Sequence, residues 1–279
     1  MKQGKHLLAF VHIGKTGGTS LIHLLRRRLF LRCVDVRPLS SQSNGVFSAG
    51  DLKRYLAMNP SLRCVMGHSI RAYSDLDSVG IPIDYVTVLR DPVERCISRY
   101  QHRVRKHGPV DFREFMAREW LQNVQTRIIG GSTDVERAKE VLRERFALVG
   151  TLEGFDRLLV QVGAQFGWAP ESLGYERKRV AGRTGEKRHL RERYGAMVAE
   201  RQAADVELYR FANEELIPRQ EREYGGDLEG DVARLLAADA PAGVSKILGY
   251  ADFAVRKLYY EPVTSVIRIS AGLPAAGMR

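Results

Sequence analysis

The chain has 279 residues, of which 44% are hydrophobic and 28% charged, a composition typical of a soluble protein with a full core. No run approaches the roughly 18 apolar residues of a membrane helix, which excludes a protein built on membrane spans. Lysine and arginine number 44 against 33 acidic residues, giving a net charge of +11. That surplus favours an anionic partner such as a nucleotide, a glycan, an acidic lipid or a nucleic acid.

The three cysteines, Cys33, Cys64 and Cys96, lie far apart and form no CxxC pair. This pattern suits neither a disulfide framework nor a zinc site, so we expect buried thiols in a reducing compartment. The residues before the first apolar run are too few for a signal peptide and include no cleavage site. We therefore expect a cytoplasmic protein without a transmembrane segment, for which peripheral membrane contact stays open.

Short apolar runs alternate with helical patterns through the first two thirds of the chain. Expected strands cover residues 6–12, 62–66, 85–89 and 146–150, and expected helices cover residues 19–31, 93–104 and 154–166. Asp91 followed by Pro92 is a typical helix start, with an N-cap acceptor and proline in the first turn. Strands alternating with helices predict an α/β fold with a doubly wound, mostly parallel sheet.

The last third of the chain has a different pattern. Residues 186–223 are rich in Arg, Glu, Ala and Leu, which favour helix, and Gly225 and Gly226 punctuate the end of this segment. Residues 227–279 are rich in alanine, with scattered aromatic residues. We therefore predict an α/β domain over residues 1–226 and a helical C-terminal appendage over residues 227–279, whose role the sequence leaves open.

The stretch HIGKTGGTSL begins at His12 and lies between the first expected strand and the helix that follows it. It is not a Walker loop, because Ala9 occupies the place of the first Walker glycine and the flexible glycines come after the lysine. Glycines at a strand-to-helix junction let backbone N–H groups approach phosphate, and the lysine adds a cation. The predicted phosphate-binding residues are Gly14, Lys15, Thr16, Gly17, Gly18, Thr19 and Ser20.

A second stretch, LRDPVERCISRY, begins at Leu89. Arg90 ends an expected strand and Ser98 lies within the helix that folds back beside it, so both side chains could face one anion. A surface salt bridge and an exposed serine are the alternative interpretation.

Together these motifs resemble the 3′-phosphoadenosine 5′-phosphosulfate (PAPS)-dependent sulfotransferase family, particularly its heparan 2-O-like carbohydrate branch. HIGKTGGTSL resembles the family's HIPKTGGTSL loop, and LRDPVERCISRY resembles its second nucleotide motif. VMGHS at residues 65–69 is similar to the segment that carries the general base. NVQTR at residues 123–127, LVGTLEGFD at 148–156 and AADVELYRFA at 203–212 resemble weaker signatures. Gly14 departs from the family, which has proline at this position.

The resemblance implies a role for each motif. Residues 14–20 would hold the 5′-phosphosulfate, and Arg90 with Ser98 would hold the 3′-phosphate. His68 would be the general base and Lys15 would stabilise the leaving phosphate, with adenosine 3′,5′-bisphosphate as the product and no metal required. The acceptor would be a hydroxyl group, most readily that of a glycan or glycoconjugate.

Alternatives stay open for the base, the closing segment and the function. His12 competes with His68 for the role of base, but it precedes the loop and is rather expected to pack or orient it. Glu153 is a further candidate base. In the basic segment 176–193, Arg179, Arg183 or Lys187 could reach the 3′-phosphate. The rival functions are a P-loop kinase using ATP and magnesium, and a non-catalytic binder of anionic glycans. We expect no nucleic-acid partner, and the oligomeric state is undetermined.

Overall fold

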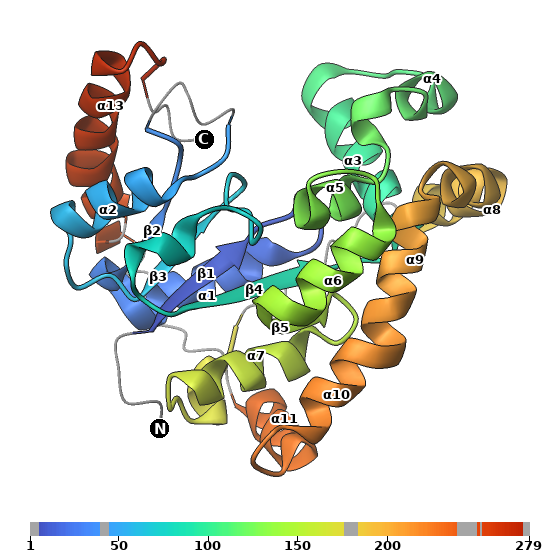
Figure 1. Ribbon diagram of the computed structural model, residues 1–279. Helices are drawn as coiled ribbons and strands as arrows, with labels where there is room; N and C mark the ends of the chain where they lie inside the picture. The colour runs from blue at the N-terminus through green and yellow to red at the C-terminus, as the bar shows by residue number, and fades with distance from the viewer. Residues whose placement is uncertain (1–5, 40–44, 176–183, 239–249, 252, 276–279) are drawn as a thin grey trace.

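A computed structural model describes residues 6–39, 45–175, 184–238, 250–251 and 253–275 of the chain (Figure 1). The described residues contain a five-stranded sheet in the order β2-β3-β1-β4-β5, in which every neighbouring pair is parallel. The strands are β1 (Leu7–Val11), β2 (Cys33–Asp35), β3 (Cys64–Gly67), β4 (Ile83–Leu89) and β5 (Phe146–Thr151). The predicted α/β class and parallel sheet are confirmed.

Side chains of the central strand alternate between two apolar layers. In β1, Leu7, Ala9 and Val11 enter one cluster, whereas Leu8 and Phe10 enter the other. This alternation makes the whole strand apolar, as expected of a parallel strand covered on both faces. Helices that contribute to the first cluster include α2 (Ala49–Met58), α6 (Val135–Arg145) and α9 (Ala203–Phe211), and those of the second include α1 (Gly18–Leu29) and α7 (Phe155–Gln165).

A third apolar cluster lies among helices at one end of the molecule (Figure 1). It joins α3 (Pro92–His107), α4 (Phe112–Met116), η4 (Glu119–Leu121) and α8 (Thr184–Arg201). Phe112 packs against Tyr194 of α8, with ring centroids 4.8 Å apart. This contact joins α4 to α8, and buried residues of α3, which carries the second candidate motif, pack in the same cluster as those of α8.

The remaining elements connect and extend these layers. They are η1 (Phe30–Arg32), η3 (Leu76–Val79), α5 (Val124–Gly130), η5 (Pro170–Leu173), η6 (Ala212–Leu216), α10 (Ile217–Arg222), α11 (Leu228–Ala237), η7 (Arg256–Tyr260) and α13 (Glu261–Ser270). The segment expected to be mainly helical, 186–223, falls within α8, α9, η6 and α10. Asp91 caps α3 by accepting from the backbone N–H of Glu94, as the sequence predicted.

The C-terminal residues pack on both layers of the core. Leu228 and Leu235 of α11 join the layer with α1 and α7, whereas Tyr260 joins the opposite layer. The Asn59 side-chain amide donates to the Tyr260 hydroxyl over 2.7 Å. The boundary after residue 226 stays a prediction. All three cysteines are buried free thiols, as expected.

Candidate functional site

The glycine loop joins the carboxyl end of β1 to α1, and its backbone has an unusual shape. Lys15 has φ +74° and Gly17 has φ +88°, both in the left-handed region. A Cβ at Gly17 would lie 2.4 Å from a methyl carbon of Leu152, and one at Gly18 would lie 2.7 Å from the His12 ring. The loop therefore requires glycine at both positions, whereas a Cβ at Gly14 would meet nothing within 4 Å.

The N-terminus of α1 has the features of an anion site. Its N-cap, Gly17, makes no side-chain capping bond, and no acidic residue lies in the first turn. Helix N-terminal N–H groups and the helix dipole favour an anion at such a position. Thr19 is exposed and Ser20 half-buried at this end of the helix. The buried Thr16 hydroxyl is already used, because it donates to the Ile13 carbonyl oxygen over 3.0 Å.

Lys15 lies among other cations. Burial lowers its pKa first, and the nearby charges of Arg105, Arg90 and Arg99 lower it further. Arg99 and Arg105 belong to α3, so this helix runs beside the glycine loop. A cluster of cations around one half-buried lysine is a site that a bound anion would stabilise.

Arg90 directly contacts the glycine loop. One of its Nη atoms donates to the Lys15 carbonyl oxygen over 3.0 Å, and the other lies 3.7 Å from a carboxylate oxygen of Glu94. Its Nε is buried without a hydrogen-bond partner in the described structure. The two motifs singled out in the sequence are thus in contact.

Glu94 links this arginine to α8. Its carboxylate pairs with Lys187 and with Arg191, the latter at 2.7 Å. Burial opposes ionisation, but the hydrogen bonds from these two cations outweigh it and lower the pKa of Glu94. Lys187 therefore lies at the same carboxylate as Arg90. The other two candidates of the basic segment, Arg179 and Arg183, lie outside the described residues.

Ser98 lies half-buried, about two turns into α3. His102 and Arg105 follow it by four and seven residues, a spacing that puts all three on one helix face. Burial lowers the pKa of His102 first, and the charge of Lys15 contributes next. This face of α3 is therefore within electrostatic reach of Lys15, and a ligand on Lys15 would lie near it.

His68 follows β3 directly, next to β1 in the sheet. Its side chain is exposed, and its Nδ1 lies 2.7 Å from the carbonyl oxygen of His12. The rings of His12 and His68 stack with centroids 4.2 Å apart. Burial, then the charge of His68, lowers the pKa of His12 to about 3. His12 is therefore a neutral packing residue at neutral pH, in agreement with its expected role.

Glu153 lies elsewhere at the carboxyl edge, after β5. Its carboxylate accepts from the Tyr209 hydroxyl over 2.8 Å. It also lines a cavity of about 210 Å³ together with Thr151, Arg157 and Asn213. Neither this contact nor this cavity joins it to His68 or Lys15. Burial lowers the pKa of Arg90, and the charge of Glu153, after that of Glu94, partly opposes this lowering.

The described residues offer neither a metal cluster nor a membrane-spanning helix. They contain no group of three or more His, Cys, Asp or Glu side chains that could hold a metal ion. Within the same residues, no helix has the length and apolarity needed to cross a membrane.

Sequence comparison gives no family for this chain, since neither models of known families nor curated proteins match it. Solved structures that are similar to it include two sulfotransferases. A sulfotransferase from Alicyclobacillus acidocaldarius has 18% identity, covers 74% of this chain and 97% of its own, and gives a TM-score of 0.38. Mouse sulfotransferase SULT7A1, complexed with PAP, has 13% identity, covers 90% of each chain and gives a TM-score of 0.40. Because both TM-scores are below 0.5, we base the function on the site residues.

Proposed function

We propose that this chain is a PAPS-dependent sulfotransferase that transfers a sulfuryl group to a hydroxyl of its acceptor. The observation that carries the proposal is the hydrogen bond from Arg90 to the carbonyl oxygen of Lys15. It joins the glycine loop to the second motif, so the candidate sites for the 5′-phosphosulfate and the 3′-phosphate are adjacent. The resemblance of both motifs to that family supplies the identity of the nucleotide.

In this proposal, different residues at the edge of the sheet act on the acceptor and on the leaving phosphate. His68 Nε2 takes the proton of the acceptor hydroxyl as the acceptor oxygen bonds to sulfur. The bond between sulfur and the phosphate oxygen breaks, and its electron pair stays on that phosphate. Lys15 and the N-terminus of α1 stabilise the charge that develops there. The product nucleotide is adenosine 3′,5′-bisphosphate.

The Nδ1–H of His68 donates to a backbone carbonyl, and this supports its role as base. A carbonyl oxygen accepts only, so the proton of the neutral ring belongs on Nδ1 and Nε2 keeps its lone pair. The stacked ring of His12 is neutral at working pH and therefore adds no repulsion when His68 becomes positively charged.

The finer identity of the acceptor rests on the resemblance to the heparan 2-O-like branch, from which we propose a carbohydrate hydroxyl. A cytoplasmic location is likewise a proposal. The test is turnover with labelled PAPS against a panel of glycans, with phenols and steroids as non-carbohydrate controls. Label in a glycan supports the carbohydrate assignment, label only in a control moves the acceptor to another class, and no transfer to any acceptor counts against the activity.

A further inference from the structure

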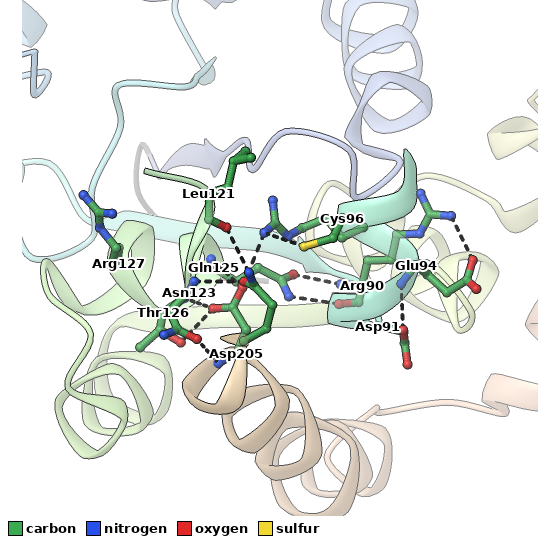
Figure 2. A network of polar contacts seen from close by, with 12 residues as sticks. Arg90, Asp91, Glu94, Cys96, Leu121, Asn123, Gln125, Thr126, Arg127 and Asp205 are labelled. Carbon is green, nitrogen blue, oxygen red and sulfur yellow. Dashed lines mark hydrogen bonds and ion pairs between the residues drawn. The ribbon is translucent and has the colours of Figure 1, made fainter. Parts of the chain in front are cut away.

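The backbone of Arg90 is held by a side chain from a distant part of the sequence. The last β4 residue, Leu89, accepts at its carbonyl from the N–H of Leu152 over 2.9 Å. For the next residue, Gln125 of α5 provides both partners: its Oε1 accepts from the Arg90 N–H over 3.0 Å, and its Nε2 donates to the Arg90 carbonyl over 2.9 Å (Figure 2). The Gln125 amide thus continues the hydrogen bonding of β4 beyond its last residue, as the peptide group of a neighbouring strand would.

Gln125 is itself fixed by a buried carboxylate. Asp205 of α9 is fully buried and accepts from the backbone N–H groups of Gln125, over 3.1 Å, and Thr126, over 2.7 Å. It thereby caps α5, whose own N-cap residue, Asn123, makes no side-chain capping bond to it. The guanidinium of buried Arg95 lies 3.7 Å from the same carboxylate.

The capping is reciprocal, which makes the arrangement rigid. Asn123 accepts at its side-chain oxygen from the N–H of Asp205 over 3.2 Å, while its own N–H donates to the Gln202 side chain over 2.9 Å. The Gln202 amide also donates to the Leu121 carbonyl over 3.1 Å. Two helix starts that are about 80 residues apart in the sequence therefore position one another.

We propose that Gln125, held by Asp205, is a positioning residue that sets the direction of the Arg90 guanidinium and so its selectivity for a ligand bearing a 3′-phosphate. This inference rests on the proposed function. The Gln125 side chain acts through Arg90 and touches no ligand. The amide suits this role, because it offers one donor and one acceptor to the two backbone groups of Arg90, whereas a carboxylate only accepts.

The test measures the affinity ratio of adenosine 3′,5′-bisphosphate to AMP by calorimetry. Gln125→Glu places an acceptor against the Arg90 carbonyl, and Gln125→Met removes both bonds without adding charge. We expect bisphosphate affinity to fall about tenfold in each variant, the scale of one hydrogen bond, with AMP affinity nearly unchanged. Gln220→Glu is the matched control: Gln220 is also buried and accepts a backbone N–H, that of Val149, far along the sequence from Arg90.

The coupling to Arg90 is tested by combining each Gln125 variant with Arg90→Ala. If Gln125 acts through the arginine, replacing Gln125 in a protein that already carries Arg90→Ala does not change the affinity ratio of the bisphosphate to AMP any further. An unchanged ratio in the single Gln125 variants, or an equal fall in Gln220→Glu, overturns the positioning role while leaving the proposed function intact. A wild-type protein that binds the bisphosphate no better than AMP overturns the 3′-phosphate assignment itself, and the inference with it.

Discussion

The ring of His68 is oriented by the backbone of His12. Its Nδ1 donates to the His12 carbonyl oxygen over 2.7 Å, and the two rings stack with centroids 4.2 Å apart. One hydrogen bond therefore selects the tautomer of His68 and joins the segment after β3 to the start of the glycine loop. An imidazole held in this way has its basic Nε2 ready for an acceptor proton.

If His68 is the base, its replacement by alanine should reduce turnover by roughly 10²–10⁴, the usual contribution of general-base catalysis. Affinity for adenosine 3′,5′-bisphosphate should change little, because the ring is proposed to face the acceptor. Steady-state kinetics with saturating acceptor measure the fall in turnover, and calorimetry measures the affinity for the bisphosphate. Near-normal turnover would move the base elsewhere, with Glu153 the next residue to replace.

Lys15→Ala should weaken nucleotide binding and turnover together. The ammonium group is proposed to meet the phosphosulfate both before and during transfer, so its loss affects ground and transition states. Lys53→Ala, which removes an exposed lysine of α2, is the control for net charge. A Lys15→Ala variant with full bisphosphate affinity would remove the lysine from the nucleotide site.

Arg90→Ala should lose about 1.5–3 kcal/mol of bisphosphate binding, the scale of a charge-assisted hydrogen bond, and much less of AMP binding. Arg90→Lys keeps the charge but not the planar fork, so it cannot replace both the bond to the Lys15 carbonyl and a bond to phosphate. In calorimetry, we expect the bisphosphate affinity of Arg90→Lys to lie between the affinities of the wild type and Arg90→Ala. Equal losses for the two nucleotides in Arg90→Ala would contradict a 3′-phosphate contact.

Removal of divalent metals should leave sulfuryl transfer intact, because lysine and backbone N–H groups are proposed to stabilise the leaving phosphate. Turnover is measured with labelled PAPS before and after EDTA, and again after magnesium is restored. A strict magnesium requirement would instead support the kinase alternative, in which the metal bridges phosphate oxygens.

Local patterns in the sequence were sufficient for four of the five described strands and for the glycine loop. The apolar run of β1 predicts a buried strand, and the spacing of Lys15, Gly17 and Gly18 predicts the loop. Both predictions work because short apolar runs and glycines reflect local burial and backbone shape. Strand β2 gave little signal: it has three residues, Cys33–Asp35, and forms only as an edge partner of β3. Helix α2 has a capping box between Ser48 and Asp51 that could have identified it.

The network around Arg90 could not be derived from local patterns. Gln125 and Asp205 lie in two segments whose family resemblance was noted, but their pairing joins positions 80 residues apart. Neither residue type is unusual in the first turn of a helix, so neither alone predicts a contact with Arg90. Their shared role depends on where β4 ends, which only the three-dimensional arrangement shows.

The pKa of His12 leads to a prediction about acid stability. The folded protein holds the pKa at about 3, against 6.5 for an unperturbed histidine, through burial and then the charge of His68. Below pH 6.5 the unfolded chain therefore binds a proton at this residue that the folded chain does not. The resulting stabilisation is fully present above about pH 6.5 and is lost as the pH falls towards 3.

The measurement compares urea unfolding of the wild type and His12→Asn at pH 7.5 and 5.5. The substitution removes the stacked ring at both pH values, so the difference in pH dependence is informative and the absolute stability is not. Between these values the wild type should lose on the order of 1 kcal/mol more unfolding free energy than the variant, because one pKa unit corresponds to about 1.4 kcal/mol. The titrating groups away from His12 are present in both proteins, so their contributions largely cancel. Parallel stability curves would mean that His12 takes up its proton in the folded state near its ordinary pKa, and so does not stack as a neutral ring on the proposed base.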